Sequence, residues 1–271
     1  MDGRPIGVFD SGLGGLTTVR ELCRLLPGED IVYFGDTGRV PYGSRSRETI
    51  VRYARQDVAF LRTFDLKLIV IACGTVSTTA LEVLAQENPI PVLGVVAPAA
   101  AAAARATQND RVGLIGTQAS IRSGAYEALI HREDPAAQVF SQPCPLFVPL
   151  VENGRFKPGD VVIETVAAEY LAPLKAAGVD TLVLGCTHYP LLEGVISAQM
   201  GPEVTLVNAG AEGARAAAAR LAELDALSGR DGGGTCRYFV SDRQEDFSRL
   251  ASIFLGWDVT GAVGQVDISR Y

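Results

Sequence analysis

The sequence lacks the features that mark several large classes of protein. No apolar run reaches the roughly 18 residues that span a bilayer, because charged residues, glycine or proline interrupt each one. Lysine and arginine form no cluster in the sequence, and the formal net charge is −7. The sequence therefore lacks the basic patch that is typical of nucleic-acid-binding proteins. The residues after Met1 show no apolar core of a signal peptide. We therefore expect no membrane span, no nucleic-acid partner and a cytoplasmic location.

Cysteine is scarce and histidine scarcer, which limits metal and disulfide chemistry. The two histidines are His131 and His188, and the five cysteines are Cys23, Cys73, Cys144, Cys186 and Cys236. An odd count without a CxxC pair is typical of a reduced, intracellular chain. Structural zinc sites use closely spaced ligand pairs, which are missing here. We expect no bound metal; the alternative zinc site would use Cys73, Cys186, His188 and Asp10, and a redox pair is a weaker alternative.

What the sequence does contain is an alternation of apolar, strand-length runs with longer helical patterns, which predicts parallel α/β units. The predicted strands of the first half are Ile6–Phe9, Ile31–Phe34, Leu68–Ala72 and Pro91–Val95. Those of the second half are Val112–Ile115, Gln138–Phe140, Leu182–Gly185 and Val204–Val207. The starts Ile6 and Val112 are 106 positions apart, and Cys73 and Cys186 are 113 apart. We interpret the two series as an internal duplication.

The remaining patterns predict helices and the division into domains. Predicted helices are Thr17–Leu26, Glu48–Thr63, Ala99–Ala104, Ala211–Leu227 and Glu245–Leu255, with a late strand at Arg237–Val240. The fold class is α/β, with two similar domains of parallel-type sheets flanked by helices and related by a pseudo-twofold axis. We expect residues 1–97 plus 209–271 to form the first domain and residues 98–208 the second. The active site is expected in the cleft between them, a favoured place for ligands.

Two strand-to-helix turns, one in each half, each present a cysteine. Cys73 follows one apolar strand and Cys186 follows another. Ligands gather at such strand ends, and a helix N-terminus there lowers a thiol pKa from about 8.5 to roughly 3.5–7.5. An arbitrary cysteine is more often a small buried hydrophobe, and we assign Cys23, Cys144 and Cys236 to that class. Two thiols on opposite walls of one cleft can remove a proton from one face of a carbon and return it to the other.

Other polar residues follow the same strands. Asp10 and Ser11 begin a glycine-rich turn that matches neither a dinucleotide fingerprint nor a P-loop. Asp10 either faces the cleft or caps a helix. Thr75 and Thr187 follow the two cysteines and offer hydroxyls for a carboxylate or for helix capping. His188 lies two residues beyond Cys186, where it can orient or deprotonate that thiol.

Together these motifs resemble the glutamate racemase family within the aspartate/glutamate racemases. The resemblance covers nearly the whole chain and rests on Asp10-Ser11-Gly12-Leu13-Gly14-Gly15, Tyr33-Phe34-Gly35-Asp36, Pro41-Tyr42-Gly43, Ala72-Cys73 with Thr75, Pro149-Leu150-Val151-Glu152 and Gly185-Cys186-Thr187-His188-Tyr189-Pro190. Related aspartate racemases tend to carry an acidic residue at the position of His188, so this histidine favours the glutamate branch.

The resemblance implies a role for each matching residue. Cys73 and Cys186 would transfer the protons, assisted by Asp10 and His188 respectively, with Glu152 near the second cysteine. Substrate would be bound by Asp10, Ser11, Tyr42, Gly43, Gly74, Thr75, Thr187 and His188. The resemblance further implies that glutamate is the substrate, that neither pyridoxal phosphate nor metal is used, that the product D-glutamate feeds peptidoglycan synthesis, and that the protein is a homodimer.

Gly74 departs from the family pattern, which usually has asparagine between the cysteine and the threonine. An amide that would contact the substrate is therefore missing, although the backbone N–H of Gly74 remains. Because both thiols are retained, we expect the reaction class to be unchanged. Three alternatives stay open: aspartate or another acidic amino acid as substrate, a binding protein without turnover, and a thiol-based metal or redox protein.

Overall fold

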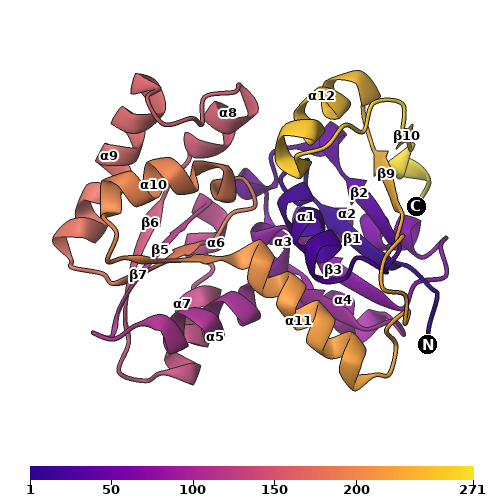
Figure 1. The fold of residues 1–271 in the computed structure, drawn as a ribbon, viewed down its shortest axis with the longest axis horizontal. Coiled ribbons are helices and arrows are strands. Elements are labelled where there is room, and N and C mark those ends of the chain that lie inside the picture. The colour runs from indigo at the N-terminus through magenta and orange to yellow at the C-terminus, as the bar shows by residue number, and fades with distance from the viewer.

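Two parallel β-sheets, each flanked by helices, make up the chain (Figure 1). The structure, a computed structural model, describes residues 1–271, apart from the side chains of Glu245 and Asp246. The first sheet has six strands in the order β10-β9-β2-β1-β3-β4, and the second has four in the order β6-β5-β7-β8. Every adjacent pair in both sheets is parallel. The predicted α/β class is confirmed.

The strands of the first sheet are β1 Ile6–Asp10, β2 Ile31–Gly35, β3 Leu68–Ile71, β4 Val92–Gly94, β9 Cys236–Val240 and β10 Val263–Gln265. Those of the second sheet are β5 Arg111–Gly116, β6 Gln138–Pro143, β7 Thr181–Leu184 and β8 Thr205–Asn208. The α-helices are α1 Leu16–Leu25, α2 Arg47–Leu61, α3 Gly74–Thr79, α4 Leu81–Glu87, α5 Val96–Ala106, α6 Gln118–Arg122, α7 Ala125–Glu133, α8 Phe147–Glu152, α9 Val161–Ala176, α10 Glu193–Met200, α11 Ala209–Glu223 and α12 Gln244–Leu255. Short 3-10 helices are η1 Thr37–Arg39, η2 Tyr42–Ser44, η3 Tyr189–Leu192 and η4 Ile268–Arg270.

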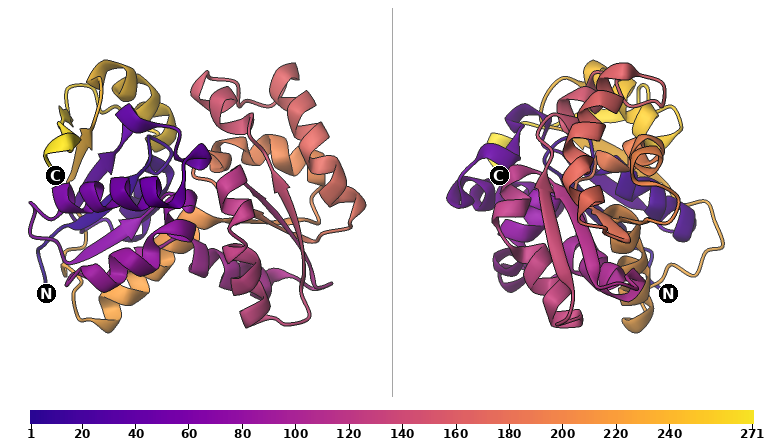
Figure 2. Two further views of the ribbon diagram at one scale, coloured as in Figure 1. Left: turned by 180° about the vertical axis from the view of Figure 1, so that it is seen from behind. Right: turned by 90° about the vertical axis from the view of Figure 1, so that its left-hand side faces the viewer.

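Successive strand residues point to opposite faces of the first sheet, so each face has its own core. Ile6 and Val8 of β1 pack in a core that also contains residues of α1, α11 and α12. Phe9, which points the other way, packs with residues of α2. The left view of Figure 2 shows the helices on this second face. Strands that are buried on both faces read as continuous apolar runs, which is why they could be found in the sequence.

The same strand order occurs twice, as the predicted duplication requires. Within the first sheet the series β2-β1-β3-β4 has the same order as β6-β5-β7-β8 in the second. The third strand along the chain in each series, β3 and β7, leads into a cysteine turn. The two turns therefore hold equivalent places at the carboxyl ends of their sheets.

The predicted strands are confirmed with small shifts of their ends, the largest at β6, which runs on to Pro143. The predicted helices correspond to α1, α2, α5, α11 and α12. The sequence analysis missed β10, an edge strand of three residues, the 16-residue helix α9, and shorter helices such as α7 and α10. Of the helices that the structure describes, none is both long and apolar enough to cross a membrane.

A buried ion pair joins three distant segments at the amino end of the first sheet. Lys67 Nζ lies 2.5 Å from Glu29 Oε2, and the two side chains are 0% and 3% exposed. The same ammonium group donates hydrogen bonds to the carbonyls of Asp2 and Ala226. Lys67, just before β3, therefore holds three segments together: the N-terminal residues, the loop before β2 and the chain after α11.

We expect Lys67→Met to lower the free energy of unfolding by about 3–5 kcal/mol, because it leaves the Glu29 carboxylate buried without a counter-charge. Urea denaturation followed by circular dichroism measures the loss. The double variant Lys67→Met/Glu29→Met should recover a large part of it. A single variant as stable as the parent would contradict this role for the pair.

Candidate active site

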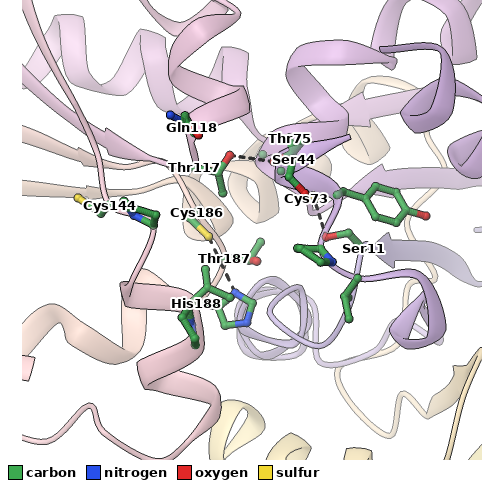
Figure 3. Close-up of a pocket in the computed structure, with 18 of the residues that line it drawn as sticks. Ser11, Ser44, Cys73, Thr75, Thr117, Gln118, Cys144, Cys186, Thr187 and His188 are labelled. Atoms are coloured by element: carbon green, nitrogen blue, oxygen red, sulfur yellow. Dashed lines mark hydrogen bonds between the residues drawn. The ribbon is translucent and has the colours of Figure 1, made fainter. Parts of the chain in front are cut away.

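A cavity of about 420 Å³ opens between the carboxyl ends of the two sheets. Its walls come from both halves of the chain, as the close-up in Figure 3 shows. The first sheet and its turns contribute Ser11, Tyr42, Gly43, Cys73, Gly74 and Thr75, and the second contributes Thr117, Gln118, Cys144, Glu152, Cys186, Thr187 and His188. A cavity of this size, apolar in most of its lining with a few convergent polar groups, is typical of a small-molecule site.

Cys73 lies at the N-terminus of α3, in the turn that follows β3. Its backbone is extended and makes it the residue before the first helical turn. The side chain is buried, and its Sγ lies 3.3 Å from the Ser11 Oγ. Burial and the neighbouring Asp10 charge raise the pKa of the Cys73 thiol to about 12, outweighing the hydrogen bond with Ser11. In the unliganded site Cys73 is therefore a thiol at neutral pH, rather than the low-pKa cysteine expected from the helix start alone.

Asp10 lies behind the cavity wall rather than in it. It is the last residue of β1, is 1% exposed, and accepts a hydrogen bond from the Gly12 N–H at 3.0 Å. Its Oδ1 has no hydrogen-bond partner among the described residues. Burial raises the pKa of this carboxyl group. Helix α1 is preceded by Gly15 and has no side-chain cap, so Asp10 is not its N-cap.

Cys186 belongs to a three-residue chain of polar groups. Its Sγ lies 3.9 Å from His188 Nδ1, and His188 Nε2 lies 3.0 Å from Glu152 Oε1. Burial lowers the pKa of His188, but the hydrogen bonds to Cys186 and Glu152 outweigh it and raise the pKa to about 10. The imidazole is thus protonated at neutral pH and directs one N–H toward the sulfur and the other toward the carboxylate. Phe254 of α12 packs at right angles to the ring and fixes its plane.

The glycine turn after β1 packs directly on the second cysteine turn. A Cβ on Gly14 would overlap the side chains of Thr187 and His188, so only glycine allows this approach. Thr17, at the start of α1, donates a hydrogen bond to the Thr187 carbonyl at 3.0 Å. These contacts join the Asp10–Gly15 loop to the Cys186 turn, and they fix the distance between the two walls of the cavity.

Hydroxyl groups bridge the cavity at its other side. Thr75 Oγ1 lies 3.0 Å from Thr117 Oγ1, and Thr117 donates to Ser120 at the same distance. The sequence analysis singled out Thr75 but missed Thr117, Gln118 and Ser120. The signal was present, since Thr117 follows β5 as Ser11 follows β1.

The Tyr42 side chain forms a wall rather than offering a free hydroxyl. Its hydroxyl donates to Asp36 and, at 3.2 Å, to Asp57. Arg39 pairs with the same two carboxylates at 2.6 and 2.8 Å. Burial and the charge of Asp36 raise the pKa of Asp57 well above its usual range. This buried network anchors the Tyr42–Ser44 segment, which leaves the Tyr42 ring and the Gly43 backbone to line the cavity.

Of the site residues predicted from the sequence, all except Asp10 line this single cavity. Cys144, predicted to be a small buried hydrophobe, lines it too, and its thiol faces its own turn by donating to the Gln142 carbonyl. Among the described side chains, no group of three or more His, Cys, Asp or Glu residues could hold a metal ion.

The fold and this cavity place the chain in a class of isomerases, the racemases. Residues 7–217 match the family model described as Asp/Glu/Hydantoin racemase, and the chain belongs to this family. More particularly, it is 48% identical over 268 residues to a glutamate racemase of Geobacter metallireducens, covering 99% of this chain and 98% of that protein.

Solved structures agree with this placement. The glutamate racemase isoform of Bacillus anthracis is 37% identical and superposes with a TM-score of 0.92 over 98% of both chains. The Francisella tularensis glutamate racemase, solved in complex with D-glutamate, is 36% identical with a TM-score of 0.91 over 100% of both chains. The resemblance found in the sequence is confirmed.

We expect Glu152→Gln to lower the pKa of His188 from about 10, because the carboxylate hydrogen bond that stabilises the imidazolium is replaced by a neutral amide. Titration of histidine-labelled protein by NMR measures the change directly. The chain has two histidines, so His131 serves as an internal reference in the same spectra. An unchanged or raised His188 pKa would contradict the role given to Glu152.

Proposed function

We propose that this chain interconverts L- and D-glutamate without a bound cofactor, by proton transfer between two cysteines. The observation that carries this proposal is the position of Cys73 and Cys186 on opposite walls of one cavity, each at the carboxyl end of its own sheet (Figure 3). The three relatives described above are all named glutamate racemase, which supports glutamate as the substrate.

In the proposed reaction one cysteine acts as thiolate base and the other as thiol acid. The thiolate takes the α-proton, the electron pair of the C–H bond stays on carbon, and the opposite thiol protonates the other face. From L-glutamate, Cys186 is the base and Cys73 the acid. The raised pKa of Cys73 suits it to hold a proton, and the protonated His188 beside Cys186 suits that sulfur to carry negative charge. After one turnover the two cysteines have exchanged roles. Because the charge on one sulfur affects the other, their pKa values describe the pair and not either cysteine alone.

The carbanion forms without an electron sink, so the site itself must stabilise charge on the substrate carboxylate. Backbone N–H groups at the start of α3 and the hydroxyls of Ser11, Thr75 and Thr187 surround the cavity. Such fixed dipoles in a water-poor site stabilise developing charge because they need not reorient. We assign Asp10 to Cys73, and the His188–Glu152 pair to Cys186, as the groups that set the charge at each sulfur.

We propose in addition that the D-glutamate supplies peptidoglycan synthesis and thereby cell-wall formation and cell shape, that the reaction takes place in the cytoplasm, and that the chain forms a homodimer. All three follow from the family resemblance; the free state of all five cysteines fits a reducing compartment. We also propose residues 1–97 plus 209–271 as one domain and residues 98–208 as the other. The pairing of β9 and β10 with the first sheet supports this division.

We expect Cys73→Ala and Cys186→Ala each to reduce racemisation by about 10³-fold or more, because either change removes one of the two proton carriers. Proton NMR of L-glutamate in D2O follows loss of the α-proton signal, and chiral chromatography detects D-glutamate. Cys23→Ala, outside the cavity, is the matched control. Near-native turnover in either active-site variant would rule out the two-cysteine scheme, and exchange of aspartate but not glutamate would overturn the substrate.

We expect Gly74→Ala to lower kcat/KM for glutamate by roughly 10- to 100-fold, because small displacements of reacting groups are costly. A Cβ at position 74 would lie 2.6 Å from the Gly185 carbonyl oxygen across the cleft, so the two walls must separate. The control is Gly116→Ala, whose Cβ meets the flexible end of Ile121 at 3.3 Å. Steady-state kinetics in both directions measure the effect; equal values for the two variants would contradict the steric argument.

A further inference from the structure

A second pair of thiols lies outside the active site. Cys23 on α1 and Cys236 at the start of β9 are 213 residues apart in sequence, yet their sulfurs are 3.4 Å apart. A disulfide bond needs the sulfurs at about 2.05 Å, an approach of about 1.4 Å that side-chain rotation can supply. Both cysteines are free and only partly buried. The sequence analysis assigned them to the class of small buried hydrophobes, which does not account for their contact.

Small molecules can reach this pair. Both cysteines line a second hollow of about 440 Å³, together with Glu29, Tyr238 and Trp257. Trp257 is 39% exposed and donates its indole N–H to the Tyr238 hydroxyl, so the rim of this hollow is in contact with solvent. Cys73 and Cys186, by contrast, are 6% and 8% exposed and line the other cavity.

Either sulfur can donate the hydrogen bond that joins the pair. Accepting the hydrogen bond from Cys23 lowers the pKa of Cys236, while the same contact raises the pKa of Cys23. The thiolate is the form that attacks an oxidant, and a neighbouring thiol is what resolves the product. The direction of these shifts favours Cys236 as the attacking sulfur and Cys23 as the resolving one, and single variants test this order.

We propose that Cys23 and Cys236 are a redox-active dithiol that forms a reversible disulfide when the protein meets hydrogen peroxide. The Cys236 thiolate attacks one peroxide oxygen, the O–O bond breaks, and the departing hydroxide takes a proton to become water. The resulting sulfenic acid is attacked by the Cys23 sulfur, the S–O bond breaks, and a second water leaves. Two thiols thus supply the two electrons that reduce one peroxide to two waters, and a dithiol reductant reverses the bond.

The disulfide would fix α1 to the C-terminal segment that begins with β9. This segment includes α12, whose Phe254 packs on His188 and accepts a hydrogen bond at its carbonyl from Arg20 of α1. A bond between residues so distant in sequence restricts the unfolded chain strongly and so stabilises the folded one. We expect the oxidised protein to melt at a higher temperature than the reduced protein.

The experiment treats the reduced, full-length protein with a small molar excess of hydrogen peroxide. Thiols are then counted under denaturing conditions, and non-reduced peptides are analysed by mass spectrometry. We expect the free thiols to fall from five to three, a peptide linked through Cys23 and Cys236, and a rise in melting temperature that dithiothreitol reverses. Three free thiols without that linked peptide would overturn the proposal.

Single variants separate this pair from other oxidation events. Cys23→Ser should abolish the rise in melting temperature and leave Cys236 as a sulfenic acid that dimedone traps. Cys236→Ser should abolish both the linkage and the trapping. Oxidation of Cys73 or Cys186 ahead of this pair, or accumulation of sulfinic acid on Cys236 in the wild-type protein, would contradict the proposal. Because the wild-type peptide map alone decides for or against the linkage, the test holds even where a variant folds poorly.

Discussion

The packing of the glycine turn after β1 on the second cysteine turn is the contact on which the site depends. Gly14 touches the side chains of Thr187 and His188, and Thr17 hydrogen-bonds the Thr187 carbonyl. Because these two turns belong to different sheets, the contact fixes how far apart the walls of the cavity stand. Any residue larger than glycine at position 14 would push the Cys186 turn away from Cys73. The proposed proton transfer between two sulfurs would need such fixed spacing, since its rate would depend on the placement of the reacting groups.

The two walls are alike in topology but different in charge. Cys73 has the buried carboxyl of Asp10 behind it, whereas Cys186 faces the protonated His188, which Glu152 stabilises. Because the same strand order occurs in both sheets, the two sulfurs occupy equivalent positions. Their charged neighbours differ, so the two cysteines do not have equivalent protonation. In the proposed reaction, a thiol at Cys73 and a Cys186 sulfur beside the protonated His188 suit the substrate enantiomer whose α-proton faces Cys186. In that proposed scheme the opposite enantiomer reacts only after a proton has moved from Cys73 to Cys186.

Much of this arrangement could be predicted from the sequence because strands buried on both faces are continuous apolar runs. The turns after β3 and β7 were identified for that reason, together with Cys73 and Cys186. The three-residue edge strand β10 gave no such signal, since a short, partly exposed strand has no apolar run. Thr117 and Ser120 were missed although Thr117 follows β5 as Ser11 follows β1, because a single hydroxyl residue after a strand is not distinctive unless a cysteine or a glycine-rich turn accompanies it. The raised pKa of Cys73 depends on Asp10 and on burial, both properties of the folded chain.

Helix α1 connects the two thiol pairs of the molecule while keeping them chemically separate. Its first turn holds Thr17 against the cavity, and its last turns carry Cys23, which faces Cys236 on the far side of the same core. A covalent bond at Cys23 would therefore fix α1 and the C-terminal segment without occupying the space where a substrate lies. The chain thus places the Cys23–Cys236 pair where oxidation would leave both proposed proton carriers, Cys73 and Cys186, unmodified.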